Sequence, residues 1–166
     1  MPAREAPHKR IEQYRGSRER FLMCELAARG AGWLEASPVE VDRPGPSYTV
    51  DTLRGLQEAR PEDELVWLLG ADQAAALPEW REPEEVLRLA EVGVARRDGI
   101  GEETVAAALS GLAGADRMTF FEMPSIDVSS TIVRERVAAS LPFRFLVPER
   151  VADRIEELGL YREGDA

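Results

Sequence analysis

Short apolar runs alternate along the chain with segments of helical periodicity. The runs Leu65–Leu69 and Val92–Ala95, and the segment MTFFEMP from Met118, are too short for helices and predict strands. The first run is nearly all apolar and ends at Gly70, which is typical of a central strand buried on both faces. Strands that alternate with helices indicate βαβ units, so the pattern predicts an α/β fold with a parallel sheet flanked by helices.

Apolar positions three or four residues apart predict the helices. In TVDTLRGLQEAR, Val50, Leu53 and Leu56 would share one helix face. Further helices are expected in SRERFLMCELAAR, EPEEVLRLAE, ETVAAALSGL, the end of IDVSSTIVRERVAAS, and PERVADRIEELGLY, which ends at Gly159. MPAREAPHKRIEQYRG is polar and irregular and predicts a loop. With no repeat and no linker, the 166 residues predict one domain over residues 1–166.

The overall charge limits the partners that the chain can bind. It has 21 Lys and Arg against 31 Asp and Glu, a formal net charge of -10. Proteins that hold nucleic acid by its phosphates need clustered Lys and Arg. The charge therefore argues against a nucleic-acid partner, and any phosphate that binds must be held locally.

The cysteine content and the hydropathy indicate the compartment. Cys24 is the single cysteine, and Leu22 and Leu26 beside it predict a buried thiol in a reducing environment. No charged segment followed by an apolar one begins the chain, and no apolar run is long enough to cross a bilayer. We therefore expect a cytoplasmic protein with no membrane partner.

The stretch IDVSSTIVRERVAAS predicts a local anion site. Ser129, Ser130 and Thr131 crowd the start of a helix, where free N–H groups and the helix dipole favour negative charge. Arg134 lies one turn further and could reach the same anion. The alternative is an ordinary helix cap followed by a surface arginine, because Ser and Thr cap helices of every kind.

Two further stretches could hold a small ligand. DRPGPSYTVDTL is a rigid turn that could hold Thr49 against a ligand, or a plain loop before a helix that begins near Ser47 or Thr49. Asp72 comes just after a predicted strand, where ligands bind in open α/β sheets, although it could simply cap the next helix. Trp80 could stack on a flat ring or could simply pack.

The sequence lacks the motifs of several common catalytic and metal sites. His8 is the only histidine, and in its polar loop a solvated side chain is expected. The sequence holds no Ser/His/Asp order, HExxH, CxxC or GxxxxGK[ST], so protease, zinc-site and P-loop functions lack support.

Five segments in order resemble one enzyme family: PHKR, RPGPSYTVDTL, LGADQAAALPEW, SSTIVRERV and LVPERVADRIEELGLY. They resemble the bacterial nicotinate-nucleotide adenylyltransferases of the nucleotidyltransferase α/β phosphodiesterase superfamily. The resemblance implies a Rossmann-like fold that binds ATP and nicotinate mononucleotide and forms deamido-NAD and pyrophosphate in NAD biosynthesis. It also implies Mg²⁺ on the phosphates of ATP, with no metal ligand assigned in the chain.

The resemblance also assigns residues to the two substrates. The ATP side comprises Ser129, Ser130, Thr131, Arg134, Lys9, Asp72 and Arg97, with Asp72 near the ribose and Lys9 near the phosphates. The nicotinate side comprises Tyr48, Thr49 and Trp80. Arg134 is the expected phosphate contact in the transition state. Asp98 follows Arg97 where the family usually has proline.

The family's opening strand and its GGTFDPPHxGH segment have no counterpart in this sequence. In the family, the two histidines of that segment contact the phosphates of ATP, so no catalytic residue is assigned here with certainty. We expect an N-terminally truncated nucleotidyltransferase domain that lacks about 30 residues, the first strand, loop and helix. We also expect the chain as given to be impaired in catalysis.

Alternative functions follow from the same segments. The chain could be another adenylyltransferase of this fold, such as pantetheine-phosphate adenylyltransferase, although RPGPSYTVDTL and GAD…LPEW favour the nicotinate enzyme. It could also be a non-catalytic nucleotide-binding remnant. Self-association into a homo-oligomer stays open.

Overall fold

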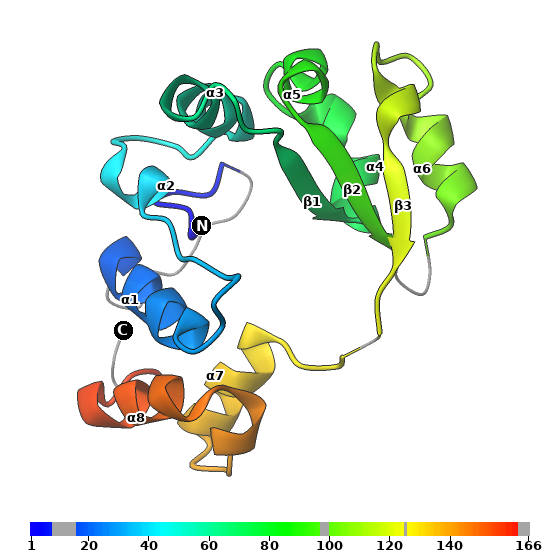
Figure 1. Ribbon diagram of the computed structural model, residues 1–166. Coiled ribbons are helices and arrows are strands. Elements are labelled where there is room, and N and C mark those ends of the chain that lie inside the picture. The colour runs from blue at the N-terminus through cyan, green and yellow to red at the C-terminus, as the bar shows by residue number, and fades with distance from the viewer. Residues whose placement is uncertain (8–15, 97–99, 125, 163–166) are drawn as a thin grey trace. The chain divides into compact units, whose positions relative to one another are not determined.

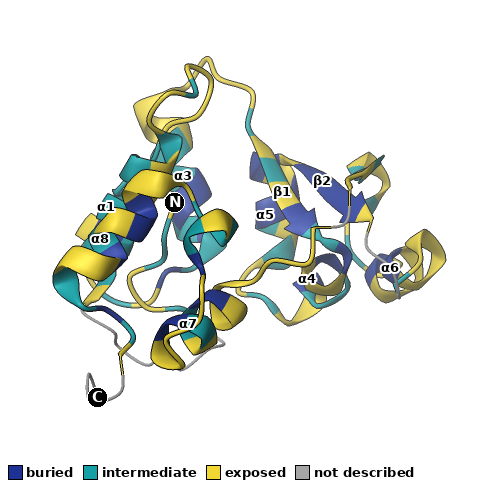
Figure 2. Cartoon of the chain, turned by 90° about the horizontal axis from the view of Figure 1, so that it is seen from below, coloured by how far each residue is buried: buried dark blue, intermediate teal, exposed yellow. Residues whose placement is uncertain are grey.

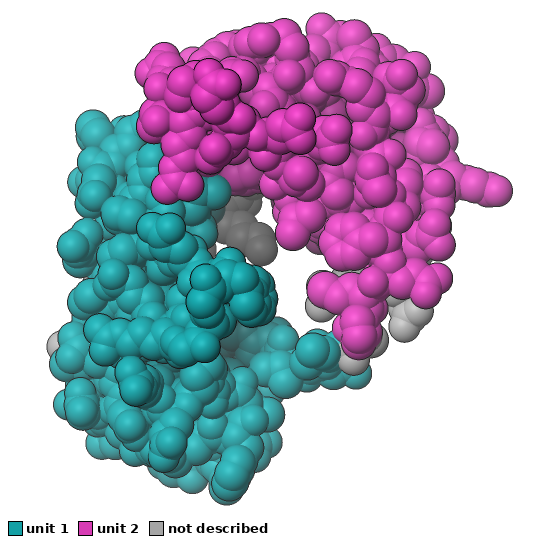
Figure 3. Space-filling model, viewed as in Figure 1, with its two compact units in different colours: residues 1–47, 126–166 teal, residues 48–125 magenta. Residues whose placement is uncertain are grey.

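The structure is a computed structural model, and it describes residues 1–7, 16–96, 100–124 and 126–162. The chain divides into two compact units, coloured separately in Figure 3. Unit 1 comprises residues 1–47 and 126–166, and unit 2 comprises residues 48–125. Each unit is described by itself below, and a single domain over residues 1–166 stays a prediction.

Unit 2 contains a parallel sheet of three strands (Figure 1). The strands are β1 (Val66–Gly70), β2 (Glu91–Arg96) and β3 (Thr119–Glu122), in the spatial order β1-β2-β3. β1 pairs with β2, and β2 pairs with β3, both in parallel. The three predicted strands and their parallel arrangement are therefore confirmed.

Helices alternate with the strands of unit 2, as the sequence predicts. They are α3 (Thr49–Ala59), α4 (Ala71–Ala75), α5 (Pro83–Leu89) and α6 (Glu102–Leu109), with short 3-10 turns η1 (Leu77–Glu79) and η2 (Ala115–Arg117). Their apolar faces meet one face of the sheet in a core that includes Val50, Leu53, Leu69, Leu77, Val86, Val92, Val94, Val105 and Leu109. Burial of these side chains is the main source of the unit's stability.

β1 differs from the prediction of a strand buried on both faces. In the described part of the chain β1 is an edge strand, and Val66 and Leu68 are 56% and 67% exposed. Alternate side chains of a strand point to opposite faces, so Trp67 and Leu69 contact the helical core while Leu68 lies over Gly93. Figure 2 shows the contrast between β1 and the largely buried β2.

Unit 1 is helical in its described residues. It contains α1 (Gly16–Ala28), α2 (Val39–Asp42), α7 (Ser130–Ala138), the 3-10 turn η3 (Arg144–Leu146) and α8 (Glu149–Leu158). Its core comprises Val133, Val137, Phe143, Val151, Ala152, Ile155 and Leu160, with Met23 and Leu26 of α1 packed against it. α8 ends where predicted, because Gly159 takes a left-handed conformation with φ of 62°.

The prediction of a buried thiol is wrong, because Cys24 is exposed on α1. Phe21 is the one buried residue of this helix, whereas Leu22 and Leu26 are only half-buried. The apolar stripe of α1 therefore turns Phe21 inward and leaves Cys24 outside it.

Residues 1–7 are irregular, as predicted, and hydrogen bonds join them to the end of the first segment of unit 1, whereas residues 8–15 of the predicted loop lie outside the described residues and Gly16 begins α1. The amide of Arg4 donates to Ser47 Oγ at 2.9 Å, and the amide of Ser47 donates to the carbonyl of Glu5 at 2.8 Å. Among the described residues, no helix combines the length and the apolar character that a membrane span requires.

Candidate functional site

The N-terminus of α7 presents three exposed hydroxyl residues. Ser129 is the N-cap: its backbone is extended, and its Oγ accepts a hydrogen bond from the amide of Ile132 at 3.2 Å. Ser130 and Thr131 follow in the first turn, and all three residues are exposed. The serine cap explains why the helix begins here, because its oxygen satisfies one of the four free amides.

Arg134 lies over the same turn. Its Nη2 donates to Thr131 Oγ1 at 3.2 Å, so the guanidinium reaches back toward the start of α7. Helical side chains tilt toward the N-terminus of their helix, which makes this approach the natural one. Free backbone amides, hydroxyls and a cation thus converge on one point, and this arrangement can bind an anion such as a phosphate.

Asp72 lies immediately after the carboxyl end of β1. It is exposed in the first turn of α4, whose N-cap is Gly70 with no side-chain cap bond. Gly70, and not Asp72, holds the N-cap position. Asp72 Oδ2 accepts a hydrogen bond from Gln73 Nε2 at 3.4 Å, and the exposed carboxylate can accept further hydrogen bonds from a ligand. A Cβ atom at Gly70 would lie 2.7 Å from Asp72 Oδ1, so glycine leaves the space that this carboxylate occupies.

The candidate ring-binding residues lie at two places in unit 2. Tyr48 is the N-cap of α3 and Thr49 is its first residue, whereas Trp80 follows η1. The amide of Trp80 donates to the carbonyl of Leu77 at 3.0 Å, which fixes the backbone at that point. Tyr48 and Trp80 are half-buried against the core of the unit, so each has apolar support and an accessible part.

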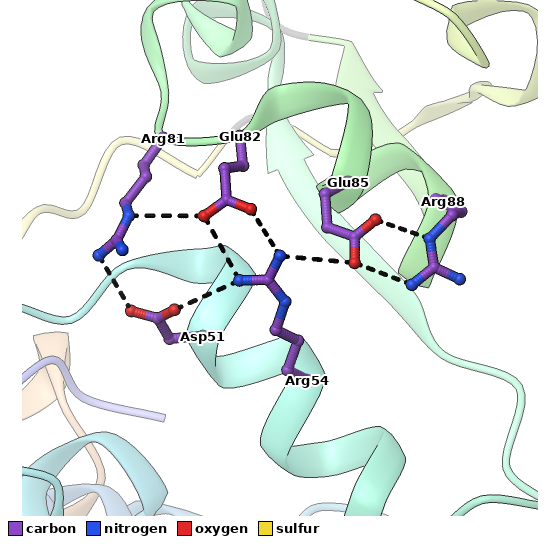
Figure 4. Close-up of polar contacts among 6 residues, drawn as sticks. All are labelled: Asp51, Arg54, Arg81, Glu82, Glu85 and Arg88. Atoms are coloured by element: carbon purple, nitrogen blue, oxygen red, sulfur yellow. Dashed lines mark hydrogen bonds and ion pairs between the residues drawn. The ribbon is translucent and has the colours of Figure 1, made fainter.

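A network of charged side chains surrounds the turn after Trp80 (Figure 4). It consists of Asp51 and Arg54 on α3 together with Arg81, Glu82, Glu85 and Arg88. Arg81 also lies with its guanidinium carbon 4.9 Å from the centroid of the Tyr48 ring, a cation–π contact. No motif in the sequence predicted this network.

The network has consistent effects on proton affinity. The hydrogen bond from Arg54 lowers the pKa of Glu82 below its ordinary value, and the hydrogen bond from Arg88 does the same to the pKa of Glu85. The pKa of Arg54 is raised, first by its hydrogen bond with Glu82. Arg54 and Glu82 therefore favour each other's charged state, and so do Arg88 and Glu85.

Three predicted residues fall outside the described residues: His8, Lys9 and Arg97. The structure brings together Ser129, Ser130, Thr131 and Arg134 within unit 1. It assigns Asp72, Tyr48, Thr49 and Trp80 to unit 2, where Arg81 adds a contact that the sequence analysis missed. The i,i+3 spacings of Asp51 with Arg54 and of Glu85 with Arg88 were the local signals for the network in the sequence.

No group of three or more His, Cys, Asp and Glu side chains that could hold a metal ion occurs among the described residues. Mg²⁺ commonly keeps several waters and is held by one or two carboxylates together with substrate phosphates. The described side chains thus offer no resident metal cage, and a metal that enters with a nucleotide needs none.

Comparisons with known proteins identify the family. The cytidylyltransferase-like family model matches residues 1–136. The nicotinate-nucleotide adenylyltransferase of Bacillus subtilis (strain 168) is 36% identical over 161 residues, which cover 97% of this chain and 80% of the relative. A probable nicotinate-nucleotide adenylyltransferase of Roseiflexus sp. (strain RS-1) is 40% identical over 162 residues, 98% of this chain and 81% of the relative.

A solved structure gives the same fold. The nicotinic acid mononucleotide adenylyltransferase of Plasmodium falciparum, complexed with NaAD, matches with a TM-score of 0.70 at 15% identity and covers 95% of this chain and 78% of its own. The likeness confirms the predicted α/β nucleotidyltransferase fold. With the 36% and 40% identities over nearly the whole sequence, it leads to one conclusion. This chain belongs to the cytidylyltransferase-like family and, within it, to the nicotinate-nucleotide adenylyltransferases.

Proposed function

We propose that this chain transfers the adenylyl group of ATP to nicotinate mononucleotide in NAD biosynthesis. The observation that carries the proposal is the 36% to 40% identity with enzymes of that name over 97% to 98% of the chain. In this reaction a phosphate oxygen of the mononucleotide attacks the α-phosphorus of ATP. The bond from that phosphorus to the bridging oxygen breaks, and the products are deamido-NAD and pyrophosphate.

The N-terminus of α7 supports the donor half of the proposal. Ser129, Ser130, Thr131 and Arg134 would hold the phosphates of ATP, because amides, hydroxyls and a guanidinium meet there. Charge grows on the departing pyrophosphate as the bond to the α-phosphorus breaks. Arg134 would stabilise this charge, so its effect should be larger in the transition state than in the ground state.

Unit 2 supplies the groups for the nucleoside and for the acceptor ring. Asp72 would accept hydrogen bonds from ribose hydroxyls, since its carboxylate is exposed at the carboxyl end of β1. Trp80 and Tyr48 would lie against the nicotinate ring, and Thr49 would donate a hydrogen bond to it. Lys9 and Arg97 would add phosphate contacts, as the family resemblance implies.

Mg²⁺ would enter as part of the ATP complex and neutralise charge on the phosphates. This is the usual form of Mg²⁺ in nucleotide-dependent enzymes, in which the ion keeps several waters and binds the substrate phosphates. The chain's own part in the reaction is then to position two anionic substrates and to exclude alternative acceptors.

Calorimetric titration and product analysis test the proposal. The chain is titrated separately with nicotinate mononucleotide, nicotinamide mononucleotide, phosphopantetheine and MgATP. It is then incubated with MgATP and nicotinate mononucleotide, and deamido-NAD and pyrophosphate are quantified by chromatography. We expect nicotinate mononucleotide to bind most tightly of the three acceptors and the two products to form in equal amounts.

Other results would lead to different functions. Preferential binding of phosphopantetheine would assign the chain to pantetheine-phosphate adenylyl transfer. Binding of nicotinate mononucleotide with no product at any enzyme concentration would make the chain a non-catalytic nucleotide-binding protein. Size-exclusion chromatography with light scattering on the same sample would give the oligomeric state.

A further inference from the structure

The turn that follows Trp80 holds an unfavourable backbone conformation. Glu82 has φ of 51° and ψ of 58°, in the left-handed region that non-glycine residues seldom adopt. It also precedes Pro83, a position that favours extended backbone. Such a conformation costs free energy and persists only when its surroundings enforce it.

Arg54 of α3 contacts the side chain of Glu82 at this turn. Its Nη2 donates to Glu82 Oε2 at 2.5 Å, and its Nη1 donates to Glu82 Oε1 at 3.4 Å. The two bonds form a fork that joins α3 to the turn before α5 (Figure 4). Arg54 also lies 3.8 Å from Asp51 on its own helix and 3.5 Å from Glu85 on α5.

The fork adjoins both candidate ring-binding residues. Trp80 stands two positions before Glu82 in the chain, and Tyr48 is the N-cap of the helix that carries Arg54. Arg81 connects the two sides: its guanidinium stacks on the Tyr48 ring, and its Nη1 lies 3.5 Å from Asp51. A displacement of the turn would therefore disturb Arg81, and through it the stacked face of Tyr48.

The charges of the network balance within it. The cations Arg54, Arg81 and Arg88 face the anions Asp51, Glu82 and Glu85. A group of this composition offers no net charge to an anionic substrate. Its effect on binding must come through the positions that it fixes.

We infer that Arg54 and Glu82 are positioning residues for the acceptor ring. Their fork holds the Trp80–Glu82 turn against the start of α3 and so fixes Tyr48 and Trp80 in the orientation that stacks on nicotinate. The inference rests on the proposed function of Tyr48 and Trp80, and it adds residues that do not touch substrate. Loss of the fork leaves the ring-binding side chains in place but less ordered, so each binding event has to order them again.

Binding measurements on three variants test the inference. Glu82→Gln removes the charge of the acceptor with little change in size, Arg54→Gln removes the guanidinium, and Arg54→Lys keeps the charge without the two-point geometry. We expect the Kd for nicotinate mononucleotide to rise about tenfold in both glutamine variants and by a smaller factor in Arg54→Lys. The Kd for MgATP should stay within twofold of the wild-type value.

Arg88→Gln is the matched control. It breaks a comparable ion pair, in which Arg88 Nε lies 2.6 Å from Glu85 Oε2. Among the residues drawn in Figure 4, Arg88 contacts only Glu85. Its Kd for nicotinate mononucleotide should equal that of the wild type. If the wild-type chain binds nicotinate mononucleotide and the two glutamine variants bind it equally well, the positioning role is wrong and the proposed function stands. If the wild-type chain does not bind it, both fall. Equal losses of affinity for both substrates would show general destabilisation and overturn the inference.

Discussion

Arg154 of α8 donates two hydrogen bonds to Glu19 of α1, from Nε to Oε1 at 2.8 Å and from Nη2 to Oε2 at 3.1 Å. The Glu19 side chain is only 13% exposed, whereas most of the other ion pairs of the chain are open to solvent. This fork joins residues that are 135 positions apart in sequence. It therefore ties the early helix of unit 1 to the last one.

Replacement of Glu19 by glutamine should lower the thermal stability of unit 1. The glutamine side chain has one acceptor oxygen, whereas glutamate has two, so only one of the two hydrogen bonds from Arg154 could remain. That bond would also lack the negative charge of the carboxylate. We expect the Tm to fall by a few degrees in a calorimetric scan. Asp42→Asn is the control, because the Arg18–Asp42 pair is more than 60% exposed on both sides and should contribute little.

Arg134→Ala should weaken MgATP binding about tenfold, the usual loss when a charge-assisted hydrogen bond to phosphate is removed. The affinity for nicotinate mononucleotide should change less. Arg136→Ala removes the same charge from the same helix, but Arg136 donates to the carbonyl of Pro142 at 2.6 Å. Titration calorimetry on both variants measures the difference. Unchanged MgATP affinity in Arg134→Ala would remove this residue from the site.

Trp80→Ala should raise the Kd for nicotinate mononucleotide more than the Kd for MgATP, because a stacking surface for the ring would be lost. The Tm should also fall, since the indole packs against the core of unit 2. Trp33→Ala is the comparison, because Trp33 is 86% exposed and should affect neither. Equal losses for both ligands in Trp80→Ala would mean that this side chain only packs.

Gly70→Ala should displace the carboxylate of Asp72. The added methyl group would lie 2.7 Å from Asp72 Oδ1, so the side chain must rotate away from β1. Weaker MgATP binding, measured by calorimetry, is the expected result if Asp72 contacts the ribose. Gly111→Ala, where a methyl group would meet no atom within 4 Å, should leave binding unchanged.

The Arg54–Glu82 pair should make stability depend on pH in a defined window. The pKa of Glu82 lies below its ordinary value of 4.5 in the folded chain, first because of the hydrogen bond from Arg54. The ionised carboxylate therefore stabilises the fold fully above pH 4.5, and this contribution disappears as the pH falls through the lowered pKa.

The difference in Tm between wild type and Glu82→Gln tests this behaviour. It should be constant from pH 7 down to about pH 5.5 and shrink below pH 4.5. It should also shrink in 1 M salt, because the pair is solvent-exposed. Glu84→Gln, in the same first turn of α5, is the control. A difference that persists unchanged at pH 3 would contradict the ion-pair explanation.

Local patterns were sufficient to predict most of the elements. Val50 and Leu53 are buried on α3 as their spacing predicted, and Gly159 ends α8. The position of a strand within its sheet depends on neighbours that the strand's own residues do not encode. For this reason the apolar run at Leu68 predicted burial that the structure does not show.

In the candidate site, too, contacts within one element could be predicted from the sequence, whereas contacts between distant elements could not. The hydroxyls and Arg134 share one helix turn, so their convergence follows from helix geometry. The fork between Arg54 and Glu82 joins residues 28 positions apart and depends on the path of the chain between them. The left-handed backbone at Glu82 occurs at a residue type for which sequence patterns do not anticipate it.

Glu82 also bears on efforts to engineer a more heat-resistant form of this chain. Glycine suits a positive φ, so replacement by glycine would relieve the strain of the left-handed backbone at this position. The same replacement removes the carboxylate that holds Arg54. Relief of the backbone strain and loss of the Arg54–Glu82 ion pair therefore oppose each other in the free energy of unfolding, while the affinity for the acceptor falls with the ion pair. A more heat-resistant form of this chain is better sought at positions outside this turn.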